Sequence, residues 1–421
     1  MKKIQIILVS LLILCFESQA EKPILFIGAT THIGNGQVYE NSVISVENGL
    51  FKIVGDATKI RINPSAFDTI YRLYGKHIYP AFIVPNTTLG ITEIGAVRAT
   101  HDYKEVGSFN PNVRTLIAYN TDSKILKTII SNGVMIAQVT PKGGVVSGQS
   151  AVMYLNGENW EDSQIKADDG IHLNWPSSFY STGWWAEPGE IKKNKEYSNK
   201  IEEMGRFFKK AYAYYIASNI MDLKMESIKG LFNGNKTLYI HSNNANDMRD
   251  AIRFAKKYNI KNIVIVGGED ALKISNLLKK HNIPVILKRT HRLPASQDKA
   301  IDEPFTQAKK LKEEGVLFCL SYAGDMEAMG ARNLPFTAGT TVAYGQSYED
   351  AVSSITLNAA KILKIDDFIG SIEKDKEATF FISDGDALDM KSNNVIKAYI
   401  KGKEINLIDH QKELYKKYKN R

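Results

Sequence analysis

The stretch Pro80-Ala81-Phe82-Ile83-Val84-Pro85-Asn86-Thr87-Thr88-Leu89-Gly90 divides the chain into two kinds of sequence. Before it, residues 23–79 alternate short β-rich runs with turn signals, which predicts a small antiparallel sheet. After it, short apolar runs alternate with segments whose apolar residues recur at helical spacing, which favours a parallel sheet with helical crossovers. The stretch itself is an apolar run followed by the polar residues Asn86 and Thr88.

The alternation is clearest in the second half of the chain. We expect strands at residues 237–241, 262–266, 283–287 and 316–320, and helices at residues 245–258, 271–281 and 306–314. Such a run fits an open doubly wound sheet or a closed barrel, and the pattern does not separate the two. The β-rich pattern returns at residues 378–385 and 395–403. We therefore expect one composite domain built from both ends of the chain.

The first twenty residues have the features of a secretory signal peptide. Met1-Lys2-Lys3 is a charged start, residues 4–16 are apolar, and Ser18-Gln19-Ala20 provides small residues for cleavage after Ala20. The apolar run is too short to span a membrane. We expect an exported protein, periplasmic or secreted, with no integral membrane segment after cleavage.

Charge and cysteine content exclude some classes of function. The 421-residue chain has a net charge of +8, and its lysines are scattered except for a dense run in the C-terminal tail, which predicts a solvated helix end. Because no basic stripe interleaved with aromatic residues accompanies it, we expect no nucleic-acid partner. Cleavage would leave Cys319 as the one cysteine, so no intramolecular disulfide is expected.

Several motifs resemble the amidohydrolase superfamily, and in particular its imidazolonepropionase-like branch. Residues 80–90 resemble the end of the first barrel strand, which reads Pro-Gly-Phe-Ile-Asp-Pro-His-Thr-His-Leu in the family. Residues 333–339 and 356–363 resemble the region after the last strand, and residues 369–379 resemble the return to the β-domain. The resemblance implies an α/β fold: a (β/α)8 TIM-type barrel over residues 80–365 beside a small composite β-sandwich from residues 23–79 and 366–410.

The resemblance also implies a catalytic divalent metal, but several ligand positions have changed. Asn86 and Thr88 stand in the positions of the first histidine pair, and Gly267 stands where a later histidine is expected. His241 matches a metal histidine of the family, and Asp325 is placed near its last aspartate. A catalytic zinc ion typically keeps about three protein ligands and a water. We therefore expect either no cofactor or a single zinc-type ion at a degenerate site that retains His241 and Asp325.

Two other histidines follow predicted loops or strands and are candidates to replace the lost ligands or to contact an anionic substrate: His101 and His291. The predicted substrate-binding set is Asn86, Thr88, His101, His241 and His291, and Asp325 is the predicted catalytic residue that would relay protons. The remaining histidines form no HxH or HExxH spacing, so a surface or core role is expected for each. The glycine-containing segment of residues 142–150 is predicted to be a strand-to-helix connection rather than a phosphate loop.

These observations leave three functions open. The first is an exported hydrolase that acts on non-peptide carbon-nitrogen bonds, amide or cyclic amide, in a small molecule. The second is a metal-free pseudoenzyme that binds a small-molecule ligand in the same barrel. The third is a subunit that forms a homo-oligomer or pairs with an intact paralogue.

Overall fold

The computed structural model describes residues 23–419 except for residues 185, 188, 218, 219, 297 and 325. The predicted signal peptide of residues 1–20 lies outside the described residues. Within the described ranges, no helix is long and apolar enough to cross a membrane.

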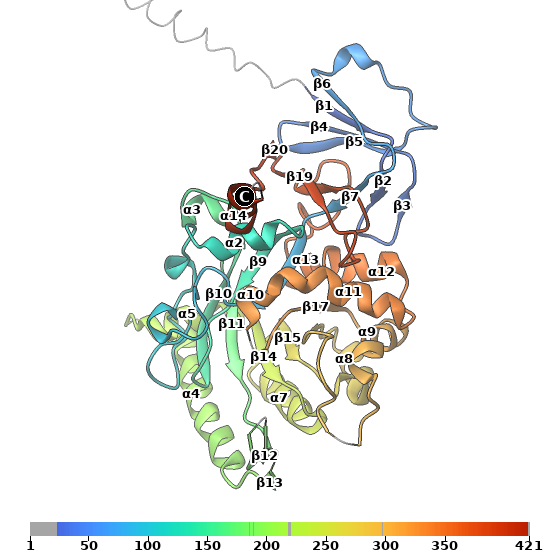
Figure 1. Cartoon of the computed structure of the whole chain (residues 1–421). Helices are drawn as coiled ribbons and strands as arrows, with labels where there is room; N and C mark the ends of the chain where they lie inside the picture. The colour runs from blue at the N-terminus through green and yellow to red at the C-terminus, as the bar shows by residue number, and fades with distance from the viewer. Residues whose placement is uncertain are drawn as a thin grey trace, which may run out of the picture.

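The centre of the molecule is an eight-stranded, nearly closed barrel sheet (Figure 1). Its strands, in spatial order, are β17 (Phe318–Leu320), β16 (Val285–Leu287), β15 (Ile263–Gly267), β14 (Thr237–Ser242), β11 (Gln164–Asn174), β10 (Val146–Tyr154), β9 (Val134–Val139) and β8 (Phe82–Thr87). The two edge strands do not pair with each other. Instead, the backbone N–H of Ile83 in β8 donates to the carbonyl of Ile355 at 2.8 Å. The predicted barrel is confirmed.

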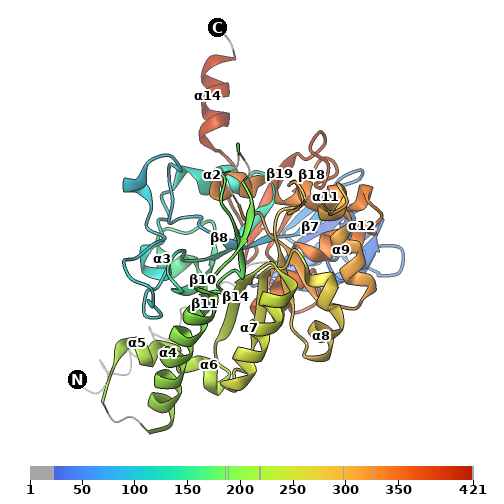
Figure 2. The ribbon, with the colours of Figure 1, turned by 90° about the horizontal axis from the view of Figure 1, so that it is seen from below.

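Helices cover the outside of the barrel, because each parallel pair of strands needs a crossover (Figure 2). The crossovers of the second half use α7 (Ala245–Lys257), α8 (Ser275–Lys280) and α9 (Glu303–Glu313), and α10 (Glu327–Gly330), α11 (Leu334–Ala343), α12 (Tyr348–Ser354) and α13 (Leu357–Leu363) follow β17. The predicted strands and helices between residues 237 and 320 are therefore confirmed, with ends that shift by up to four residues.

The predicted strand-to-helix connection at residues 142–150 is wrong. Residues 146–154 form β10, which runs antiparallel to both β9 and β11. Every residue of β10 is buried, so the alternation that marks a half-exposed strand is absent. Gly148 has φ +142°, and a Cβ atom there would lie 2.7 Å from the carbonyl oxygen of Val113, so the glycine allows two chain segments to approach closely.

A two-sheet β structure lies beside the barrel. One sheet has the order β5 (Leu50–Asp56), β4 (Ser42–Glu47), β1 (Ile24–Ile27) and β6 (Thr69–Arg72). The other combines both ends of the chain in the order β20 (Lys403–Glu404), β19 (Val395–Ile400), β18 (Phe380–Ser383), β7 (His77–Pro80), β2 (Thr30–His32) and β3 (Val38–Tyr39). Phe26 of the first sheet packs edge-on against Phe380 of the second, with ring centroids 5.2 Å apart.

The remaining elements lie outside the barrel sheet and the two sheets beside it. The hairpin of β12 (Phe179–Ser181) and β13 (Ile191–Lys193) leads into the long helix α4 (Tyr197–Ala217). The shorter helices are α2 (Lys124–Ile130), α3 (Trp160–Ser163), α5 (Leu223–Ile228) and α6 (Gly230–Asn233). The exposed helix α14 (His410–Tyr418) ends the chain, as expected for its lysine-rich sequence.

Candidate functional site

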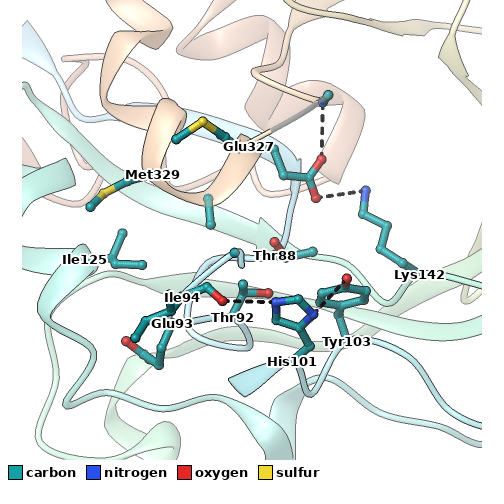
Figure 3. A pocket seen from close by; sticks show the side chains of 14 residues that line it. Thr88, Thr92, Glu93, Ile94, His101, Tyr103, Ile125, Lys142, Glu327 and Met329 are labelled. Atoms are coloured by element: carbon teal, nitrogen blue, oxygen red, sulfur yellow. Dashed lines mark hydrogen bonds and ion pairs between the residues drawn. The ribbon is translucent and has the colours of Figure 1, made fainter. Parts of the chain in front are cut away.

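A cavity of about 520 Å³ opens beside the C-terminal ends of β8 and β9. Its wall combines the loop after β8, the residue Lys142 after β9, and the segment around α10 (Figure 3). In a barrel of this type, loops at the C-terminal ends of the strands build the functional site. The lining is mostly apolar and includes Ile94, Ile125 and Met329, with a few polar groups that could orient a ligand.

Lys142 is the central charged group of this site. Its Nζ donates to Oδ1 of Asn86 at 3.2 Å and lies 3.3 Å from Oε1 of Glu327. Glu327 opens α10, and its other carboxylate oxygen accepts from the backbone N–H of Gly324 at 3.3 Å. An ammonium group has three donors, so Lys142 retains one donor for a ligand in the cavity.

The backbone of β8 orients the Asn86 side chain toward the ammonium group of Lys142. Asn86 is buried and has φ +53°, a left-handed conformation that asparagine tolerates better than most residues. Its backbone N–H donates to Oε1 of Gln138 at 3.2 Å. Asn86, which the sequence predicts to stand in the position of a metal histidine, is therefore hydrogen-bonded on both its backbone and its side chain.

His241 forms a pair with His172 deeper in the barrel. Nδ1 of His172 and Nε2 of His241 are 2.9 Å apart and share a hydrogen bond. Burial and the nearby ammonium of Lys142 lower the pKa of His241 to about 3, and burial and His241 lower the pKa of His172 well below its ordinary value. Both imidazoles are therefore neutral at physiological pH.

A buried polar network lies beneath the histidine pair. The ring of His172 stacks on Tyr239 with centroids 4.7 Å apart, and the Tyr239 hydroxyl donates to Asp169 at 2.6 Å. Gln138 donates to the same carboxylate at 2.8 Å, and Nζ of Lys166 lies 2.7 Å from its other oxygen. Each oxygen of this buried carboxylate therefore has a partner, which offsets the cost of removing it from water.

The other predicted site residues lie in different places. Thr88 and His101 line the cavity, and both ring nitrogens of His101 are occupied, by the carbonyl of Ile94 at 3.1 Å and by the hydroxyl of Tyr103 at 3.2 Å (Figure 3). His291 does not join them. It lines a separate pocket beside α11, where its Nε2 is 2.6 Å from the Thr340 hydroxyl. Asp325 lies outside the described residues.

The described residues do not fit the metal site that the family resemblance implies. Within residues 23–419, apart from the gaps given above, no group of three or more His, Cys, Asp or Glu side chains could hold a metal ion. The Asn86 oxygen is already occupied by an ammonium group, and a like-charged metal ion next to Lys142 would be repelled. We therefore derive no chemical step through a metal.

Sequence reasoning missed the roles of Lys142, Glu327 and His172. A signal for Lys142 existed, because it follows the strand that ends at Val139, where strand-end residues of a barrel converge. His172 is likewise near the end of β11. Glu327 gave no signal, because its approach to Lys142 depends on how the segment after β17 folds back over the barrel.

Comparisons with known proteins agree with this architecture. Residues 226–405 match the family described as the Amidohydrolase family. An amidohydrolase from Thermotoga maritima MSB8 is 25% identical, with 91% of this chain and 99% of that chain covered and a TM-score of 0.75. An adenosine deaminase from Xanthomonas campestris with bound zinc is 13% identical, with 90% of this chain and 92% of that chain covered and a TM-score of 0.54. A molinate hydrolase is 13% identical, with 92% of this chain and 95% of that chain covered and a TM-score of 0.56.

The two structures at 13% identity show the fold alone. The chain matches no curated protein sequence. Together, the family match over residues 226–405 and the structural neighbours agree with the resemblance to the amidohydrolase superfamily, and they support a hydrolase. The imidazolonepropionase-like branch stays a prediction.

Proposed function

We propose that the protein is an exported hydrolase that cleaves a non-peptide carbon-nitrogen bond, amide or cyclic amide, in a small molecule bound beside Lys142. The observation that supports this most directly is the placement of the Lys142 ammonium between Asn86 and Glu327 at the edge of the cavity. A cation that can stabilise a developing oxyanion and a carboxylate that can accept a proton are the two groups that such a hydrolysis needs.

Each group has a defined role in this proposal. Glu327 accepts a proton from water as the water oxygen attacks the carbonyl carbon, and the free donor of Lys142 hydrogen-bonds the carbonyl oxygen as it becomes negative. The carbon-nitrogen bond then breaks, and Glu327 returns the proton to the leaving nitrogen. The products are a carboxylic acid and an amine, and water is the one co-reactant.

A substrate screen with matched variants tests the proposal. The mature protein, treated with a chelator, is offered aliphatic amides, cyclic amides and cyclic ureides, and product formation is measured for the wild type, Lys142→Met, Glu327→Gln and the control Lys124→Met. Lys124 is an exposed lysine at the start of α2. We expect turnover to fall by about 100-fold or more in the first two variants and to persist in the control. Turnover that requires an added divalent metal, or that survives in Lys142→Met, contradicts the proposal.

A ligand-binding protein without catalysis is the second candidate. It is favoured by the hydrogen bond between His172 and His241, which commits these ring nitrogens to each other rather than to a substrate. Saturable binding of a screened compound, read as a rise in melting temperature without any product, would decide for this function.

Export and assembly are proposals of their own. Export rests on residues 1–20 and predicts a mature N-terminus at Glu21, which N-terminal sequencing of the periplasmic or secreted fraction would test. Self-association, or pairing with an intact paralogue, is measured by sedimentation of the mature protein.

A further inference from the structure

A second pocket lies at the opposite end of the barrel. It has a volume of about 210 Å³ and is lined by residues at the N-terminal ends of four neighbouring strands: Thr237, Ile263, Pro284 and Leu317. It shares no lining residue with the cavity beside Lys142. It is therefore spatially separate from the proposed hydrolytic site.

The charged side chains of this pocket all carry the same sign. Lys256, Lys261, Lys361 and Lys364 line it together with His281, and no carboxylate side chain is among its lining residues. Among the residues that the structure describes, none of these four ammonium groups has a hydrogen-bond or ion-pair partner. The lysines therefore bring positive charge to one place without local compensation.

The conformation of Lys364 adds a second observation. Lys364 follows α13 and has φ +56°, a left-handed conformation that glycine usually provides at the end of a helix. Burial and the charge of Lys166 lower the pKa of Lys364, while Asp169 acts in the opposite direction. Asp169 is itself paired with Lys166 at 2.7 Å and does not line the pocket. The chain thus holds a lysine in an unfavourable backbone conformation beside other positive charges.

We infer that this pocket binds a small, multiply charged oxyanion of the phosphate type. Ammonium groups bind phosphate oxygens through charge-assisted hydrogen bonds, and several of them around one anion remove their mutual repulsion. The volume is below the range of about 300–1,000 Å³ that is typical of pockets for drug-sized ligands, so an inorganic phosphate or a small phosphomonoester fits better than a larger ligand.

Helix dipoles give a simpler explanation for part of the arrangement. Lys256 and Lys361 lie in the last turns of α7 and α13, where cations are favourable in any protein. Lys261 lies outside any helix, however, and the dipoles do not explain why all four lysines line one pocket that has no carboxylate. The two explanations differ in whether the lysines act together on an anion.

The test is calorimetric titration of the whole mature chain at low ionic strength, with sodium phosphate, pyrophosphate and glycerol phosphate as probes and sodium chloride as the ionic-strength control. We expect saturable binding of at least one probe. The double variant Lys256→Gln/Lys361→Gln should weaken it at least tenfold. The matched control Lys257→Gln, which changes an exposed lysine next to Lys256 that does not line the pocket, should leave the affinity unchanged.

Tighter binding of glycerol phosphate than of phosphate would assign the site to a phosphorylated organic ligand, and the reverse order would assign it to inorganic anions. If the double variant does not fold, Lys364→Gly removes one ammonium group, permits the left-handed backbone, and should weaken binding in the same direction. The inference is overturned if no probe binds beyond the chloride control, or if the lysine variants bind as tightly as Lys257→Gln.

Discussion

The neutral histidine pair should make the protein sensitive to mild acid. Below the ordinary histidine pKa of 6.5, the unfolded chain binds protons at His172 and His241, whereas the folded protein keeps both rings neutral because their pKa values are lowered. The free energy of unfolding is therefore not reduced by the pair above pH 6.5. It decreases as the pH falls from 6.5 toward about 3, where His241 also titrates in the folded protein. The free energy of unfolding therefore rises with pH between about pH 3 and pH 6.5.

The magnitude follows from the number of protons. At about pH 5.5 an unfolded histidine is roughly nine-tenths protonated, so each buried ring contributes a slope of about 1.2 kcal/mol per pH unit and the pair about 2.5. The assay is urea unfolding between about pH 5 and pH 6.5, above the range where carboxylates titrate, in the presence of a chelator.

The variant His172→Phe keeps an aromatic ring beside Tyr239 and should lower the slope by about half, whereas the exposed-site control His410→Gln should leave it unchanged. His77 and His291 also have lowered pKa values and add to the slope in every variant, so the difference between variants is the quantity to compare. Equal slopes in the wild type and His172→Phe would refute the reasoning.

Three substitutions test packing and hydrogen bonding in the barrel and at its contact with the second sheet. Gly133→Ala should destabilise the fold by about 2 kcal/mol or more in urea unfolding, because Gly133 has φ +85° and the new Cβ would lie 2.5 Å from the buried ring of Phe381. The control is Gly36→Ala, which measures the cost of the backbone conformation alone, because Gly36 has φ +96° and no atom beyond its chain neighbours would lie within 4 Å of the new Cβ. Tyr239→Phe should cost about 1–3 kcal/mol, because it removes the 2.6 Å hydrogen bond to Asp169, and an unchanged urea midpoint would disprove that role. Thr92→Val should be neutral or raise the melting temperature, because the buried Thr92 hydroxyl has no partner within the described residues; a clear loss of stability would argue against this.

The strands and helices of the barrel could be predicted from the sequence because its second half repeats one unit. Between residues 237 and 320, each apolar run is followed by a segment of helical spacing, and this local pattern predicts a parallel sheet with helical crossovers. The choice of a closed barrel over an open sheet came from the family resemblance, because closure depends on contacts between distant parts of the chain. The strand β10 was mispredicted for a local reason as well. It is buried on both faces, so it lacks alternation, and its glycine, Gly148, fits a loop as well as a strand that passes close to another segment.

The site could be predicted only in part. The position of Asn86 at the end of the first barrel strand was recognised from its flanking sequence, but its partner was not. The contact of Lys142 with Glu327 joins a loop after β9 to a helix after β17, and such a contact depends on the closure of the barrel rather than on any local signal. The hydrogen bond between His172 and His241 also has no local signal. The two residues lie on the neighbouring strands β11 and β14, which are separated in the sequence by the segment that contains α4, α5 and α6.

The pairing of β7 with β18 has a consequence for biogenesis. Pro80 aligns with Phe380, so the middle of this sheet joins strands made early and late in synthesis. Until β18 and β19 emerge, β7 keeps an open edge and the first sheet keeps an uncovered apolar face, both of which invite aggregation. If the chain is exported unfolded, the strands that leave the translocation channel last are the ones that finish the sheet. Nonsense mutations or proteolysis near the C-terminus should therefore yield insoluble chains that depend on chaperones, even though the whole barrel sequence has been made.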